Sequence, residues 1–162
     1  MTKSLKALCV LFFALILLSG CTSAKRSALK TDFSADFSAG YHGQKLCGNL
    51  TYNRQGRMNL RINSPETLEG LSVGYCDGEL RLSKDGLQCT ADEAYLPCAS
   101  FPATLKDLLG EICREEENGG LKLSDGKAKI GEWTLDFDSE GFIKSLESSD
   151  SEIVLENAGK LV

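Results

Sequence analysis

Few side chains in this sequence are placed to carry out acid, base or nucleophilic chemistry. The single histidine, His42, precedes a glycine at the end of an expected strand, where surface histidines are more common than catalytic ones. Two carboxylate pairs, Asp92 with Glu93 and Asp136 with Asp138, could act in acid–base catalysis or hold a cation, but solubility alone also explains them. The sequence has no serine-hydrolase elbow, zinc-protease motif, phosphate-binding glycine loop or dinucleotide fingerprint. We therefore predict a protein that is not an enzyme and needs no cofactor or metal.

The first 21 residues indicate where the protein works. Lys3 and Lys6 give a positive start, and residues 7–18 form an unbroken apolar run. At about 1.5 Å per residue, that run is too short to cross a hydrocarbon core of about 30 Å, and the pattern is typical of a secretory signal peptide. Residues 18–21, Leu-Ser-Gly-Cys, resemble the lipobox of bacterial lipoproteins. This implies that the Cys21 thiol receives a diacylglyceryl group and that the chain is cut just before it.

The lipobox resemblance implies a lipid-anchored protein, the alternative being an ordinary signal peptide that a cysteine happens to follow. Residues 1–20 would be a removed signal peptide, residues 21–30 a lipidated tether, and residues 31–162 a single domain large enough for its own core. Two acyl chains hold a protein stably on a bilayer, so the domain would sit on the extracytoplasmic face of a membrane. Both the outer face of a plasma membrane and the periplasmic side of an envelope membrane stay open.

The mature domain would be acidic. The removed segment holds two lysines and no acid, so 16 basic residues remain against 23 acidic ones, a net charge of −7. This charge argues against nucleic acid as a partner. In the tether, Lys25, Arg26 and Lys30 could add attraction to anionic lipid headgroups, or they could simply solvate a linker.

Five cysteines remain once Cys9 is removed and Cys21 is lipidated. They are Cys47, Cys76, Cys89, Cys98 and Cys113. An odd number allows at most two internal disulfides and leaves one thiol over, and the sequence does not fix their state. No CxxC pair or neighbouring histidine indicates zinc, so the simplest interpretation is a set of small buried hydrophobes.

Behind the tether, short strands alternate with tight turns. Glycine-containing turn signals occur at 55–56, 77–78, 85–86, 125–126 and 139–141. Apolar and polar residues alternate with a period of two at 33–41, 46–52, 58–62 and 133–137. Glycine supplies the positive φ of hairpin turns, and strands with one dry and one wet face are typical of antiparallel sheets. We expect about eight to ten such strands.

Two helical segments interrupt the strands. Apolar residues with helical spacing predict a helix over about 102–114, with the acidic run 115–117 as its solvated end. The apolar positions are Leu105, Leu108, Leu109 and Ile112, with Cys113 at their edge. Residues 64–70 predict one helical turn, in which Ser64 caps and Pro65 takes the first position. The fold class is therefore mainly β (α+β): a twisted antiparallel sheet whose apolar face is covered by one longer helix and one short turn.

Four segments resemble the superfamily that contains the outer-membrane lipoprotein carrier and its membrane-anchored receptor. They are residues 32–53, 56–71, 72–87 and 133–157, and the likeness lies in strand order and turn placement. The resemblance implies a half-open antiparallel barrel whose concave apolar face is covered by helices. It also implies that this face holds acyl chains or other hydrophobic ligands.

We therefore expect a binding domain for a lipid or other hydrophobic ligand. Its lining would come from apolar strand residues, which could instead fill a packed core. They are Phe33, Phe37, Leu50, Tyr52, Leu60, Val73, Tyr75, Trp133, Leu135 and Phe137. The alternative is an anchored module that senses or docks another envelope protein through an exposed apolar patch or an open strand edge.

Overall fold

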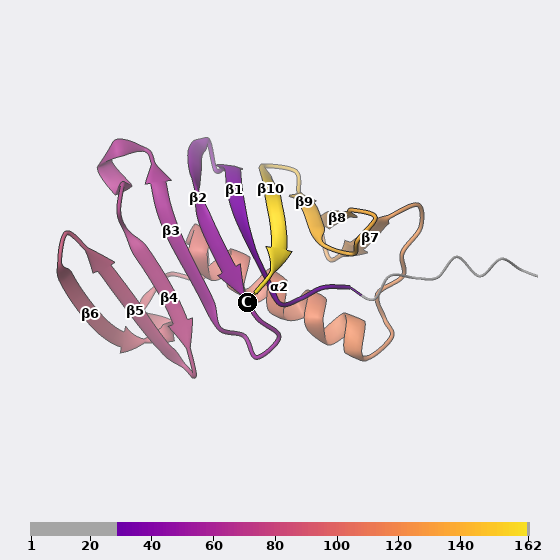
Figure 1. Ribbon diagram of the computed structural model, residues 1–162, viewed down its shortest axis with the longest axis horizontal. Coiled ribbons are helices and arrows are strands. Elements are labelled where there is room, and N and C mark those ends of the chain that lie inside the picture. Colours follow the sequence, from indigo (N-terminus) through magenta and orange to yellow (C-terminus); the bar gives the residue numbers. More distant parts are fainter. Residues whose placement is uncertain (1–28, 162) are drawn as a thin grey trace, which may run out of the picture.

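A computed structural model describes residues 29–161 as one ten-stranded sheet with a long helix on one face (Figure 1). All neighbouring strands are antiparallel, and their order is β6-β5-β4-β3-β2-β1-β10-β9-β8-β7. The strands are β1 (Phe33–Tyr41), β2 (Gln44–Tyr52), β3 (Met58–Ser64), β4 (Ser72–Cys76), β5 (Glu79–Lys84), β6 (Leu87–Asp92), β7 (Lys127–Ile130), β8 (Trp133–Phe137), β9 (Ile143–Glu147) and β10 (Ser151–Lys160). The helical segments are η1 (Glu66–Leu68), η2 (Glu93–Tyr95) and α2 (Phe101–Glu117). The predicted fold class is confirmed, and the sheet is open because β6 and β7 form its two ends.

Tight hairpin turns fix this topology. The turns 42–43, 77–78 and 85–86 have positive φ at both residues, between +46° and +83°. Two-residue turns of this kind match the twist of the flanking strands, and Gly, Asp and His tolerate the conformation better than β-branched residues. The turns predicted at 77–78 and 85–86 are therefore confirmed. Pairing of β1 with β10 joins the two halves of the chain in the middle of the sheet.

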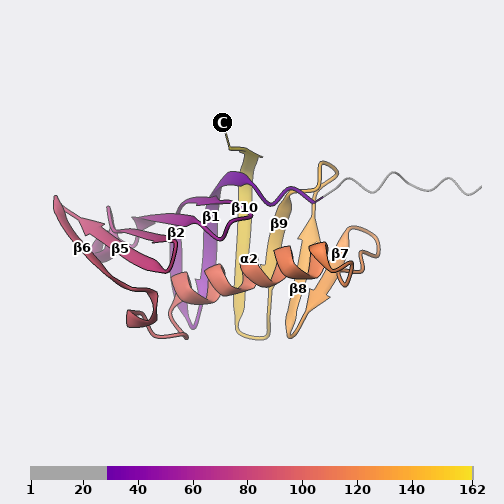
Figure 2. The ribbon, with the colours of Figure 1, turned by 90° about the horizontal axis from the view of Figure 1, so that it is seen from below.

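Helix α2 lies across one face of the sheet (Figure 2). It ends three residues beyond the predicted C-terminus and begins one residue earlier than predicted. Its buried side chains are Phe101, Ala103, Leu105, Leu108, Leu109, Ile112 and Cys113, which include every position predicted for its apolar face. They form one core with the inward side chains of the strands. Burial of each large apolar side chain contributes about 1.5–3 kcal/mol, so this contact between helix and sheet is a main source of stability.

The short turn after β3 differs from the prediction in its cap. The 3₁₀ turn η1 starts after Pro65, and no side chain caps it. Ser64 is still the last residue of β3 and pairs with Cys47, so its predicted capping role is wrong. Leu68 packs against the core, as expected for a turn that covers the apolar face.

The first described residues lie at the β7 end of the sheet, opposite β6 (Figure 1). Leu29 packs against the core, and the Lys30 backbone N–H donates to the Gly141 carbonyl at 2.9 Å. The Lys30 ammonium lies 4.3 Å from the centre of the Phe142 ring. The end of the predicted tether therefore rests on the turn between β8 and β9. Cys21 lies outside the described residues.

Candidate ligand-binding pocket

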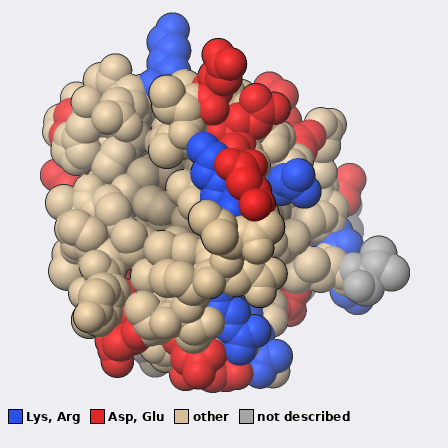
Figure 3. Space-filling view, turned by 90° about the vertical axis from the view of Figure 1, so that its left-hand side faces the viewer, with Lys and Arg blue, Asp and Glu red and all other residues tan. Residues whose placement is uncertain are grey.

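A pocket of about 440 Å³ opens on the concave face, beside the start of α2. Leucine, isoleucine and valine side chains of the strands and of the β3–β4 connection form most of its wall. They are Leu46, Ile62, Leu68, Leu71, Val73 and Leu82. The wall contains no Lys, Arg, Asp or Glu of the described chain. Figure 3 shows the β6 side of the molecule, where uncharged residues form the hollowed part of the surface. Ligand pockets commonly have this size and this mainly apolar lining.

The pocket exists because α2 begins too far along the sheet to cover all of its concave face. Phe101, the first residue of the helix, closes the inner end. Its ring centre lies 5.5 Å from that of Phe37 and 5.4 Å from that of Tyr41. Aromatic pairs at this separation pack favourably and are rigid, so the wall between pocket and core is well defined.

A few polar groups reach the pocket. The Tyr41 hydroxyl is already engaged, 3.0 Å from the Ala99 carbonyl oxygen and 2.8 Å from Thr104 Oγ1. Ser100 Oγ is buried and finds no hydrogen-bond partner within the described chain. A buried hydroxyl left in this way costs about 1–3 kcal/mol, so a polar atom of a ligand could offset that cost. Gln44 is exposed at the rim.

The structure places most of the predicted lining residues elsewhere. Val73 lines the pocket. Trp133 is half-buried and packs against the core. The other eight are buried in the core: Phe33, Phe37, Leu50, Tyr52, Leu60, Tyr75, Leu135 and Phe137. The reason is the path of α2, which packs on the part of the sheet where these large side chains face inward. The pocket wall comes instead from smaller aliphatic residues near the β6 end.

His42 lies on the pocket rim and has an acidic neighbour. Its Nδ1 is 3.0 Å from Asp150 Oδ2, and both side chains are about half exposed. Ser100 Oγ lines the same pocket but makes no hydrogen bond to His42. A nucleophile–base contact of the serine-hydrolase type is therefore not formed between these two residues.

The first carboxylate pair has local structural roles. Asp92 accepts a hydrogen bond from the Ala94 backbone N–H at 2.9 Å and so starts η2, a turn without a counterpart in the sequence-based expectations. Glu93 forms an ion pair with Lys106 of α2 at 2.7 Å. These contacts hold the segment that leads into the helix.

The second carboxylate pair is not a pair on one strand face. Strand β8 ends at Phe137, so Asp138 lies beyond the strand that carries Asp136. Asp138 instead accepts hydrogen bonds at 2.9 Å from the backbone N–H groups of Glu140 and Phe142, which shapes the β8–β9 turn. Within residues 29–161, no group of three or more His, Cys, Asp or Glu side chains could hold a metal ion.

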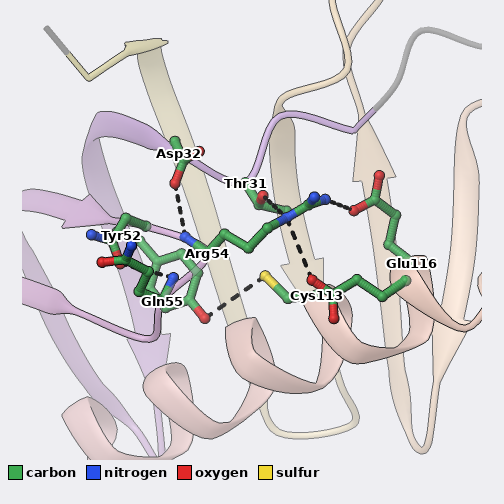
Figure 4. Close-up of polar contacts among 9 residues, drawn as sticks. Thr31, Asp32, Tyr52, Arg54, Gln55, Cys113 and Glu116 are labelled. Atoms are coloured by element: carbon green, nitrogen blue, oxygen red, sulfur yellow. Dashed lines mark hydrogen bonds and ion pairs between the residues drawn. The ribbon is translucent and has the colours of Figure 1, made fainter. Parts of the chain in front are cut away.

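Arg54 joins the far end of α2 to the sheet (Figure 4). Its backbone N–H donates to Asp32 at 2.8 Å, and its Nε donates to Thr31 Oγ1 at 3.3 Å. Its guanidinium also pairs with Glu116 near the helix C-terminus. The acidic run 115–117 is therefore partly engaged by the sheet rather than wholly solvated. No local pattern in the sequence indicates the Arg54–Glu116 contact, because the two residues lie more than sixty positions apart.

The five cysteines of the domain are free thiols in the structure. The interpretation as small buried hydrophobes holds for Cys113 but is wrong for Cys89 and Cys98, which are exposed. Cys113 Sγ lies 3.8 Å from the Tyr52 hydroxyl beneath α2 (Figure 4). Burial raises the pKa of the Cys113 thiol above its ordinary value, and burial likewise raises the pKa of Tyr52.

We expect alkylation of the reduced protein to separate these thiols. The thiolate is the reactive form, so a raised pKa together with burial should slow the reaction of Cys113. Cys98 should be labelled by iodoacetamide in the native protein, and Cys113 only in urea. Mass spectrometry of the labelled peptides measures both rates. Equal labelling of Cys113 and Cys98 under native conditions would contradict the packing of α2 described here.

Comparisons with known proteins return no family assignment. No protein-family model matches the chain, and no curated protein is significantly similar to it in sequence. Within residues 29–161, no helix is both long and apolar enough to cross a membrane.

Proposed function

We propose that this chain is a membrane-anchored extracytoplasmic lipoprotein that binds a lipid or other hydrophobic ligand and is not an enzyme. The apolar pocket of about 440 Å³ beside α2 is the observation that carries the proposal. The anchor is the diacylated Cys21 that the lipobox resemblance implies. The likeness of strand order and turns to the lipoprotein carrier and receptor superfamily supports the same function.

The pocket chemistry favours a ligand with one apolar chain and an uncharged or polar head. Each methylene group that enters the wall of aliphatic side chains contributes about 0.8 kcal/mol. The head would remain at the rim, where His42 and Gln44 are exposed. A carbonyl or hydroxyl oxygen placed deeper would give Ser100 Oγ the partner that it lacks.

The position of the pocket suits exchange with the aqueous side. The described chain starts at the β7 end of the sheet, and the pocket lies toward the β6 end. A domain tethered through Leu29 and the residues before it would therefore carry its pocket away from its point of attachment. A ligand would enter from solution or from another protein.

Filling the pocket should weaken ligand binding. Leu82→Trp places a large side chain in the cavity, and we expect the dissociation constant for the fluorescent fatty acid cis-parinaric acid to rise about tenfold or more, because several methylene contacts are lost. Fluorescence titration of the detergent-exchanged full chain measures the change. Native mass spectrometry of protein from membranes would show the physiological ligand in the unsubstituted protein.

A matched variant controls for the added indole. Lys144→Trp lies on an exposed position of β9, outside the pocket lining, and should bind the probe as the unsubstituted protein does. If both variants bound the probe with an unchanged dissociation constant, the probe would bind outside the pocket, and the proposal would be contradicted.

An anchored protein-interaction module is the second candidate, because strand β6 offers an exposed sheet edge. Chemical cross-linking and capture from intact membranes, compared with lipid extraction of the purified protein, separates the candidates. Bound lipid supports the first function. A stoichiometric protein partner with an empty pocket supports the second.

A further inference from the structure

Strand β6 is an unprotected edge of the sheet. It pairs with β5 on one side, and no strand of residues 29–161 pairs with its other side. Five of its six residues are exposed, and Leu87 at its start is 78% exposed. Its sequence contains no lysine, arginine or proline, and its one charge is the terminal Asp92. Proteins normally protect such an edge, since its free backbone groups can pair with another strand.

The opposite edge of the same sheet is protected. Strand β7 has only four residues, and two of them are Lys127 and Lys129. Short length and edge lysines are the usual devices that prevent strand addition. Because only one of the two edges is unprotected, the contrast indicates that β6 is left open for docking.

The hairpin geometry determines which β6 groups face outward. Lys84 and Leu87 flank a two-residue turn, so they form a hydrogen-bonded pair. Alternation then directs the backbone groups of Leu87, Cys89 and Ala91 to β5. The backbone N–H and C=O groups of Gln88 and Thr90 consequently point away from the sheet.

We propose that β6 pairs antiparallel with β6 of a second copy of this chain, about a two-fold axis through Cys89. Gln88 of each copy then faces Thr90 of the other, and each pair exchanges two backbone hydrogen bonds. On the concave face Leu87 lies opposite Ala91, and Cys89 lies opposite Cys89. The dimer would be one continuous sheet, isologous as a two-fold interface requires.

The residue types favour this register over its neighbour. Residues that face each other across the dimer must share a face of the sheet, so the two-fold axis passes through a residue and not between two residues. Besides Cys89, only an axis through Thr90 would pair nearly all residues of the strand. An axis through Thr90 would place exposed Leu87 opposite the acidic Glu93. The axis through Cys89 matches apolar with apolar and polar with polar side chains, and Asp92 lies opposite Gly86. It therefore avoids placing like charges opposite each other within the strand.

The cysteine count supports the same pairing. Directly opposed residues of a non-hydrogen-bonded pair have Cα atoms about 4.5 Å apart, at the short end of the range that a disulfide spans. An odd number of cysteines in an exported domain indicates either an intermolecular disulfide or a free reactive thiol, and Cys89 is exposed enough for the first. In an oxidising compartment, a disulfide reagent would take two electrons from the two Cys89 thiols, forming one S–S bond and two reduced thiols of the reagent. The β6 interface itself does not need this bond.

The experiment uses the full chain in density-matched detergent, first under reducing conditions. Sedimentation equilibrium should show a dimer. Cys89→Lys places two ammonium groups opposite each other, so its dimer dissociation constant should rise roughly tenfold or more. Cys98→Lys changes the other exposed cysteine, which lies off the strand, and should leave the dimer unchanged. Circular dichroism verifies that both variants fold.

Oxidation then tests the register. Oxidised glutathione, which is reduced as the protein disulfide forms, should convert the protein and its Cys98→Ser variant to a covalent dimer on non-reducing gels. Cys89→Ser should give no covalent dimer while remaining a dimer in the centrifuge. A reduced protein that is monomeric, a Cys89→Lys variant that dimerises normally, or a cross-link through a cysteine other than Cys89 would overturn the proposal. None of these readouts depends on ligand in the pocket.

Discussion

Replacing Gly48 with alanine should lower the free energy of unfolding by about 3 kcal/mol or more. A Cβ at this position of β2 would collide with the Arg61 carbonyl oxygen of β3 and would stand 2.9 Å from the Phe37 ring. The register of the β2–β3 pair shifts between Cys47 and Gly48, and this irregularity brings the two backbones close together. Because Arg61 contributes a backbone atom in the middle of the sheet, it cannot yield without disturbing neighbouring strands.

Urea unfolding followed by circular dichroism measures this loss. Gly40→Ala is the matched control, since Gly40 lies in the adjacent strand β1 and a Cβ there meets nothing within 4 Å. That variant should stay within about 0.5 kcal/mol of the unsubstituted protein. If both substitutions lowered the free energy of unfolding equally, the loss would come from replacing a glycine in any strand and not from the close approach of the backbones at Gly48.

Local patterns in the sequence predicted several of the strands and the long helix of this fold. The strand 33–41 alternates apolar and polar residues, and the structure buries every second side chain of β1 along most of its length. The helix was predicted by leucine spacing, which reports directly on the face that packs. The helix continues to Glu117, three residues beyond the predicted end, and its last turn carries an ion pair between Arg54 and Glu116, which are distant in sequence. Contacts of this kind have no periodic signal.

The pocket was less predictable than the fold. Sequence reasoning favoured large aromatic residues such as Phe137, because they are the most apolar positions on the strands. Whether such a residue lines a cavity or fills a core depends on where α2 crosses the sheet, and spacing does not encode that path. The walls of the pocket come partly from Leu68 and Leu96, which lie in connections rather than in patterned strands. Of the predicted lining residues, Val73 is the one that lines this pocket, because it lies on β4 beside the part of the concave face that α2 leaves uncovered.

Replacing Cys21 with serine should move the protein from the membrane fraction to the soluble fraction of cells. The proposed anchor is a diacylglyceryl group joined to the Cys21 sulfur through a thioether. Each buried methylene of its two acyl chains contributes about 0.8 kcal/mol to membrane affinity. A serine hydroxyl at position 21 would not accept the diacylglyceryl group that the lipobox resemblance implies. Apart from the three basic residues of the tether, the acidic chain should be repelled by an anionic bilayer, since its net charge would be −7 after signal removal.

Fractionation with immunoblotting, together with the intact mass of the membrane-extracted protein, measures both the location and the acyl group. Cys9→Ala is the matched control, because Cys9 lies inside the apolar run and its replacement leaves the anchor residue in place. It should remain in the membrane with the acyl mass on Cys21. If Cys21→Ser protein stayed in the membrane fraction to the same extent, a determinant other than the lipid would hold it there. The lipid anchor would then be excluded, whereas the pocket would remain to be tested by ligand binding, since its geometry does not depend on Cys21.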